Sequence, residues 1–132
     1  MTPRKKRWRY MVAARRIAKE QGEELHDGDW EKAWSLLDKF GIPVFTYAMR
    51  DSERKLVKIG KSYNPQARLK TLRIGNAGNL KLLGYCKQKE PLTEKNIHNL
   101  LSEFRVSGEW FTDCSEVQQI VSEIRRASYV NE

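Results

Sequence analysis

The sequence contains 132 residues, of which 39% are hydrophobic and 32% are charged, and its formal net charge is +8. A chain of this length can bury one core, and its four Trp, five Tyr and four Phe argue against a fully disordered protein. It contains no run of about 18 apolar residues, and no apolar segment follows the basic N-terminus as in a secretory signal. Cys86 and Cys114 lack the number and spacing of a disulfide framework or a zinc finger. We therefore expect a cytoplasmic protein without a membrane span.

Positive charge is concentrated in two parts of the chain. Residues 1–19 contain eight Lys or Arg and no Asp or Glu, whereas residues 20–43 contain two basic and seven acidic residues. Residues 44–112 contain thirteen basic and six acidic residues. Such segments suit a polyanion, because each phosphate contact releases counterions; the alternative is a basic surface kept for solubility. The residues that we expect to contact nucleic acid are Arg4, Lys5, Lys6, Arg7, Arg9, Arg15, Arg16 and Lys61.

Two helices are expected before residue 43. Residues 4–21 lack Gly and Pro and form either a basic helix or a segment that stays disordered until it meets nucleic acid. Residues 29–40 have the apolar spacing of a helix, with Asp29 as its N-cap and Gly41 at its end. The two Trp residues of this second helix are expected to pack on the core rather than to bind bases.

The elements that follow alternate between strands and helices. The sequence predicts strands at 44–49, 55–60 and 80–86, a helix from Asn64 to Gly75, a helix opened by Pro91 and Thr93, a short turn or strand at 108–112, and a final helix with a capping box of Ser115 and Gln118. This order predicts an α+β fold with a small, mainly antiparallel, three-stranded sheet flanked by helices. We expect a basic N-terminal helical extension at 1–43, a core at 44–112, and a C-terminal helix at 113–132 that packs on the core.

Five motifs follow one another in the central segment. They are Tyr47-Ala48-Met49-Arg50-Asp51, Leu56-Val57-Lys58-Ile59-Gly60-Lys61-Ser62, Asn64-Pro65-Gln66-Ala67-Arg68-Leu69, Glu94 followed by His98, and Gly108-Glu109-Trp110-Phe111. In this order and spacing, residues 44–112 resemble the GIY-YIG nuclease superfamily, in the branch typified by the phage T5 orf172-like and meiotically up-regulated gene 113-like domains. The resemblance implies cleavage of a phosphodiester bond with one divalent metal ion, Mg²⁺ or Mn²⁺.

Two charged residues carry the roles that this resemblance implies most directly. Glu109 would hold the metal, since a hard carboxylate with waters and substrate phosphate is a common Mg²⁺ site. Arg68 would hold two phosphate oxygens with its planar, permanently charged guanidinium. The alternatives are that Glu109 is a surface acid in a tight turn and that Arg68 is an exposed helical arginine.

Three further residues are candidates for catalysis: Tyr47, Lys58 and His98. Lys58 stands at the position of the family's second tyrosine, and it would contact the scissile phosphate or lower the pKa of a neighbouring phenol. Tyr47 corresponds to the first-motif tyrosine; a phenol with a pKa of about 10 acts as a base only beside positive charge, which Lys58 and Arg68 could supply. Tyr63 is a second candidate for this base, and the alternative for Tyr47 is a cross-strand aromatic. His98 lies one turn after Glu94, and the resemblance implies a proton carrier or a phosphate contact; otherwise it is an ordinary surface or packed histidine.

Two functions from different classes follow. The leading hypothesis is a metal-dependent endonuclease, acting on DNA rather than RNA, whose basic N-terminal segment holds the backbone. The second is a catalytically inactive nucleic-acid-binding or inhibitory module, such as a phage accessory protein in the host cytoplasm. It is favoured by Lys58 at the position of the second tyrosine and by Phe45-Thr46-Tyr47 in place of Gly-Ile-Tyr. A structural interaction protein, with a basic N-terminal segment that serves solubility, is a third hypothesis. A protein partner could also bind through the N-terminal segment. Arg68 and Glu109 favour the enzyme.

Overall fold

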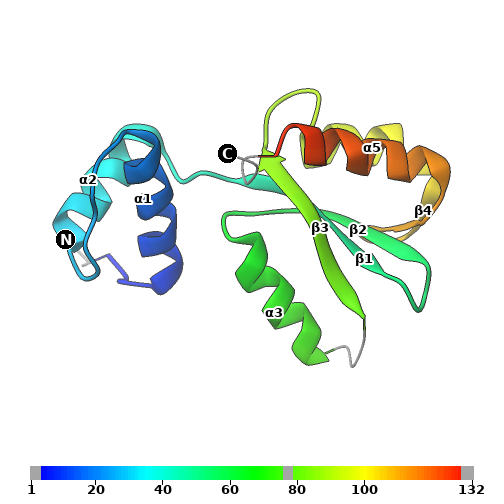
Figure 1. Cartoon of the computed structure of the whole chain (residues 1–132), viewed down its shortest axis with the longest axis horizontal. Helices are drawn as coiled ribbons and strands as arrows, with labels where there is room; N and C mark the ends of the chain where they lie inside the picture. Colours follow the sequence, from blue (N-terminus) through cyan, green and yellow to red (C-terminus); the bar gives the residue numbers. More distant parts are fainter. Residues whose placement is uncertain (1–3, 76–78, 129–132) are drawn as a thin grey trace. The chain divides into compact units, whose positions relative to one another are not determined.

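The computed structural model describes residues 4–75 and 79–128, and the chain divides into two compact units, residues 1–43 and 44–132. Figure 1 shows both units. Within the described ranges, none of the helices combines the length and the apolar character needed to cross a bilayer.

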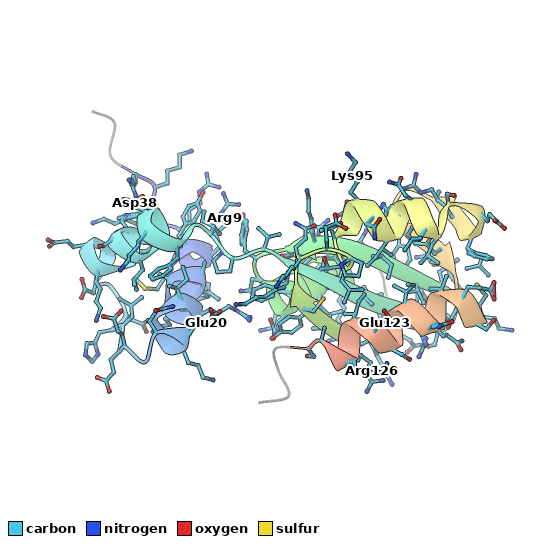
Figure 2. All side chains as sticks on the ribbon, turned by 90° about the horizontal axis from the view of Figure 1, so that it is seen from above. Arg9, Glu20, Asp38, Lys95, Glu123 and Arg126 are labelled. Atoms are coloured by element: carbon cyan, nitrogen blue, oxygen red, sulfur yellow. The ribbon has the colours of Figure 1, made fainter. Side chains whose placement is uncertain are left out.

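The first unit is a pair of helices, α1 (Trp8–Glu20) and α2 (Trp30–Phe40). Their shared core is built largely from small side chains, which allow the helices to approach closely: Ala13, Ala14, Ala18 and Ala33, with Met11, Ile17, Leu36 and Leu37. Residues 8–20 therefore form a helix, which is the first of the two predicted alternatives. Figure 2 shows Glu20 at the end of α1 and Asp38 on α2.

The second helix follows its sequence signals. The Asp29 side chain accepts a hydrogen bond from the Lys32 amide at 3.2 Å, and Gly41 follows the helix with a φ of +79°. Trp30 and Trp34 pack against the helix-pair core, with their ring centroids 5.6 Å apart. The prediction that these two rings serve packing is confirmed.

The second unit contains one antiparallel sheet with helices on both faces, which confirms the α+β prediction. Its strands are β1 (Phe45–Asp51), β2 (Leu56–Ser62), β3 (Leu80–Lys87), β4 (Arg105–Ser107) and β5 (Trp110–Thr112), in the order β3-β1-β2-β5-β4. Its helices are α3 (Pro65–Gly75), α4 (Glu94–Leu100) and α5 (Ser115–Arg126), with a 3-10 turn at Ser102–Phe104. The sheet has five strands rather than the three predicted, because the region around 108 forms a hairpin with three residues in each strand. A three-residue strand is too short to show the alternation that identifies β1 and β2.

Alternating side chains of β1 and β2 divide the core into two layers. Phe45, Tyr47 and Met49 face the side on which Leu69 and Leu72 of α3 pack. Ala48, Val57 and Ile59 face the other side and pack against apolar residues of α4 and α5: Ile97, Leu101, Val117, Val121 and Ile124. In Figure 1, α3 covers one face of the sheet and α5 covers the other. Lys95 on α4 and Arg126 on α5 are exposed and point away from the sheet (Figure 2).

The start of the last helix differs from its prediction. The N-cap of α5 is Cys114, whose side chain makes no capping hydrogen bond, so Ser115 is already helical and the Ser115–Gln118 capping box does not form. Gln118 instead donates to Asp113 Oδ1 at 3.1 Å, and Asp113 also pairs with Arg50 at 2.9 Å. The ion pair with Arg50 holds the Asp113 carboxylate beside Gln118. The Gln118 side chain therefore bonds Asp113 and does not cap the helix.

Candidate functional site

The β1–β2 hairpin positions two of the predicted site residues on the α3 side of the sheet. Tyr47 lies opposite Gly60, and Met49 lies opposite Lys58. Because Val57 and Ile59 face the opposite layer, Lys58 and Gly60 share the face of Tyr47. Tyr47 is 1% exposed and Lys58 is 7% exposed, so both polar groups are held within protein and must find their partners there.

Gly60 allows the site to close. A Cβ atom at this position would lie 2.5 Å from the Tyr47 hydroxyl oxygen and 2.8 Å from Oε2 of Glu109. Both distances are shorter than any normal contact of a Cβ atom, so the phenol and the carboxylate meet over a backbone that has no side chain. The sequence identifies Gly60 only as part of a motif. The approach of the Tyr47 hydroxyl and the Glu109 carboxylate to Gly60, which requires a glycine, is visible only in the structure.

Helix α3 brings Arg68 to the same place. Asn64 caps the helix, since its Oδ1 accepts from the Ala67 amide at 3.2 Å, and Pro65 stands at the first helical position as predicted. Arg68 therefore lies in the first turn of α3. It is exposed, and its side chain hydrogen-bonds the Tyr47 side chain. The guanidinium thus reaches solvent while it contacts the buried phenol.

The β4–β5 hairpin supplies Glu109. Its backbone carbonyl accepts from the Ile59 amide at 3.0 Å, which ties the hairpin turn to β2. Its carboxylate Oε1 lies 3.6 Å from Nζ of Lys58, and the Glu109 side chain is 35% exposed. Lys58 is also 5.2 Å from the ring centroid of Trp110, its neighbour across the strands. Four of the predicted residues, Tyr47, Lys58, Arg68 and Glu109, therefore come together around Gly60.

The charges around Tyr47 act in opposite directions. Burial raises the pKa of Tyr47 above its ordinary value of 10.0, and the nearby Glu109 carboxylate raises it further. The hydrogen bond and the positive charge of Arg68 lower the pKa, and Glu94 raises it. The net direction is upward, so the phenol keeps its proton at neutral pH. Of the two cations expected to favour the phenolate, Arg68 does act on Tyr47, whereas Lys58 pairs with Glu109.

His98 lies in α4 and uses both ring nitrogens within the protein. Nε2 is 2.7 Å from the Ile59 carbonyl oxygen, and Nδ1 is 2.9 Å from Nη2 of Arg105. Because a guanidinium only donates and a carbonyl only accepts, Nε2 must carry the proton and Nδ1 must accept. Its ring also contacts Phe111 edge-on, with the centroids 5.0 Å apart. To act as a proton carrier, His98 would have to break its hydrogen bond with either the Ile59 carbonyl or Arg105.

Sequence reasoning missed two partners of these residues. Glu94 was noted in a motif, yet its effect on Tyr47 could not be foreseen, because it depends on how α4 lies against the sheet. Arg105, which fixes the tautomer of His98, belongs to a strand too short to be predicted. Tyr63, the second candidate for a base, is partly buried in the loop between β2 and α3.

The basic residues predicted to contact nucleic acid divide into paired and exposed groups. Arg4 pairs with Asp38 at 2.9 Å, and Arg15 pairs with Asp27. Arg9 donates to the Tyr10 hydroxyl at 3.1 Å. Arg16 is partly buried in α1. The remaining residues of this set are exposed: Lys5, Lys6, Arg7 and Lys61.

The surroundings of Glu109 show which kind of metal site these residues could form. Among residues 4–75 and 79–128, three or more His, Cys, Asp or Glu residues do not gather at any point as a metal cluster would require. A dedicated all-protein metal cage is therefore not built from these residues. One accessible carboxylate beside a phenol instead fits Mg²⁺ or Mn²⁺ bound mainly by waters and substrate phosphate.

Comparison with known protein families identifies the family of the second unit. The T5orf172 domain family matches residues 44–127, which include β1 to β5 and α3 to α5. Comparison with curated proteins and comparison with solved structures each return no match. The matched family lies in the nuclease-type, GIY-YIG-like branch, and it covers well over half of the chain and every residue that meets around Gly60. The chain belongs to the T5orf172 domain family.

Proposed function

We propose that this protein is a metal-dependent endonuclease that hydrolyses phosphodiester bonds of DNA at the site around Gly60. The observation that carries the proposal is the meeting of a phenol, a guanidinium, an ammonium and a carboxylate at one place in a family of nuclease type. A phosphodiester resists hydrolysis because its charge repels nucleophiles and its alkoxide leaves poorly, so a site must supply both positive charge and proton transfer.

Each residue has a role that its surroundings support. Arg68 is exposed and permanently charged, so it binds the scissile phosphate and stabilises the charge that builds up on its oxygens. Lys58 holds the Glu109 carboxylate in place, and Glu109 is the residue that would hold Mg²⁺ or Mn²⁺. When bound there, such an ion would stabilise transition-state charge and neutralise the leaving oxygen.

Tyr47 holds a proton next to the phosphate position. Burial and two carboxylates keep the phenol protonated, and Arg68 favours the phenolate. Neutralising the Glu109 carboxylate would remove one of the two negative charges that raise the pKa of Tyr47, and so would favour the phenolate, which is the form that can take a proton. We assign to His98 a positioning role, because it holds the Ile59 carbonyl next to Gly60.

A catalytically inactive DNA-binding module is the second candidate, and one contact favours it. The Lys58 ammonium pairs with Glu109 and so compensates its negative charge without a metal ion. A phosphate could then occupy the site without being cut. The basic first unit would contribute to DNA binding under either function, through contacts to the backbone rather than to base edges.

The two candidates differ in a cleavage assay. Supercoiled plasmid, and in parallel a folded RNA, would be incubated with the full chain in Mg²⁺, in Mn²⁺ and in EDTA. Nicking that needs the cation and is lost in Glu109→Gln supports the nuclease. The matched control is Glu103→Gln, an exposed glutamate in the 3-10 turn, which should cut at the wild-type rate. Binding without cleavage of either substrate, in both cations, would support the inactive module.

A further inference from the structure

Trp8 is an exposed aromatic ring in a positively charged segment. Of the four Trp residues, Trp30, Trp34 and Trp110 are partly buried, whereas Trp8 is 61% exposed at the first position of α1. Leaving a large indole in water costs free energy, and Trp8 does not belong to the core of its unit. The ring is therefore available to another molecule.

The ring of Trp8 is held in place by a charged pair. The guanidinium of Arg15 lies over it, 5.6 Å from the ring centroid, and Arg15 is itself paired with Asp27. Arg15 can reach Trp8 because long helical side chains point back toward the N-terminus. A cation over an aromatic face is attractive, and the Asp27 carboxylate fixes the position of that cation. Arg15 thus covers part of the indole, and the side chain as a whole stays 61% exposed.

The charges next to Trp8 favour an anionic ligand. Lys5, Lys6 and Arg7 directly precede it and are exposed. No acidic residue occurs in the first turn of α1 or anywhere in residues 1–19. A flat apolar ring beside several cations matches a nucleotide, which offers a base to stack on and phosphates to neutralise.

We propose that Trp8 is a stacking platform for an unpaired nucleobase, with Lys5, Lys6 and Arg7 on the flanking phosphates, so that the DNA bound by the first unit includes a single-stranded segment. A residue that intercalates into a duplex needs both ring faces, and Arg15 occupies one face of Trp8. The side chains that wedge into duplex steps are usually Phe, Leu, Ile, Met or Pro rather than Trp. This inference deepens the proposed DNA binding and is independent of cleavage at Glu109.

The test measures binding of the full chain in EDTA to fluorescent oligo-dT and to a GC-rich duplex of the same length. Stacking of one base on an aromatic ring predicts that Trp8→Ala weakens oligo-dT binding by about 5- to 150-fold and leaves duplex binding nearly unchanged. Trp8→Phe keeps a smaller ring and should recover much of the loss. Circular dichroism should show the same helix content for all variants, since Trp8 lies outside the helix-pair core.

A second exposed ring of the same unit gives a matched control. Phe40 is 45% exposed at the end of α2, with Nζ of Lys39 5.2 Å from its ring centroid, but it lies in the acidic segment 20–43. Phe40→Ala should therefore leave oligo-dT binding unchanged. Equal loss on oligo-dT and on duplex in Trp8→Ala, or no loss on either, would overturn the proposal. Failure of the plasmid assay would leave it intact, because no cleavage is measured here.

Discussion

At Gly60, the absence of a side chain lets a buried phenol and a partly exposed carboxylate approach each other. The Tyr47 hydroxyl and the Glu109 carboxylate both occupy the space that a Cβ atom would take. Since Tyr47 is almost fully buried beneath α3, it cannot move aside without disturbing the layer that contains Leu69 and Leu72. One methyl group at Gly60 therefore has to displace either the phenol or the carboxylate.

We expect Gly60→Ala to lower the free energy of unfolding by about 1–3 kcal/mol, the usual cost of overpacking a core. Thermal unfolding in EDTA would measure it. Gly84→Ala is the matched control, because its Cβ would meet one side chain, at Cγ of Arg125 2.9 Å away, rather than the two side chains of Tyr47 and Glu109. Equal stability losses in the two variants would show that the crowding at Gly60 is not special.

The raised pKa of Tyr47 has a consequence for stability at alkaline pH. A group that binds its proton more tightly in the folded state contributes stability that is present below its unfolded pKa, about 10, and is lost as the pH rises through the folded pKa. Tyr47→Phe removes this titration, so its free energy of unfolding should fall less steeply above about pH 10 than that of the wild type. Denaturant unfolding in EDTA across this range would measure both slopes. Identical slopes would mean that Tyr47 does not titrate abnormally.

The backbone amide and carbonyl of Ile59 connect β2 to the β4–β5 hairpin and to α4. Ile59 in β2 donates its amide to the Glu109 carbonyl beside β5 and accepts from His98 of α4, whose other ring nitrogen accepts from Arg105 of β4. The hairpin that carries Glu109 is therefore anchored to the strand that carries Lys58 and Gly60. On the proposed function, these contacts give His98 a positioning role at the site.

If His98 has this positioning role, two substitutions of His98 should differ in their effects on stability and cleavage. His98→Ala leaves the buried Ile59 carbonyl without its side-chain donor and should cost about 1–3 kcal/mol of stability. His98→Gln keeps an amide donor and should retain both stability and any cleavage activity. The exposed His26→Ala is the control and should change neither. If His98→Gln folds normally and loses cleavage completely, His98 is a proton carrier.

The longer strands and helices could be predicted from the sequence, whereas the packing between α1 and α2 and the β4–β5 hairpin could not. The strands β1 to β3 carry alternating or apolar runs, and the side chains of Asp29 and Asn64 cap α2 and α3 as the sequence predicts. The core between α1 and α2 is formed largely by alanines, which give little apolar contrast along a helix. The β4–β5 hairpin is too short for periodicity. The resemblance to the family predicts that Tyr47, Arg68 and Glu109 act together. Their convergence on Gly60 depends on the pairing register of β1 and β2 and on the position of the β4–β5 hairpin.

For the molecule as a whole, positive charge is carried by both units. The eight cations of residues 1–19 include Arg4 and Arg15, which already pair with Asp38 and Asp27. Removing residues 1–19 alone would expose the apolar face of α2, so the whole first unit, residues 1–43, is the segment to delete.

If about half of these eight cations contact phosphates, deleting residues 1–43 should reduce the slope of log K against log salt by roughly 3–4 on duplex DNA. Titrations at several salt concentrations in EDTA would measure this slope. The control is Lys95→Ala in the full chain, which removes one exposed cation of α4 and should change the slope by at most about 1. A slope unchanged by the deletion would assign the first unit to a partner other than DNA.

Cleavage and binding measured together in Glu109→Ala and Arg68→Ala test the central claim most directly. Glu109→Ala should reduce metal-dependent nicking by orders of magnitude, because stabilisation of transition-state charge by a metal ion is worth several kcal/mol and each 1.36 kcal/mol is about tenfold in rate. The same change removes a negative charge beside the phosphate position, so DNA affinity in EDTA should stay equal or rise slightly. Arg68→Ala should weaken both cleavage and binding, since it removes a phosphate contact. Cleavage at the full wild-type rate in Glu109→Ala would contradict the account, because the metal site would then lie elsewhere.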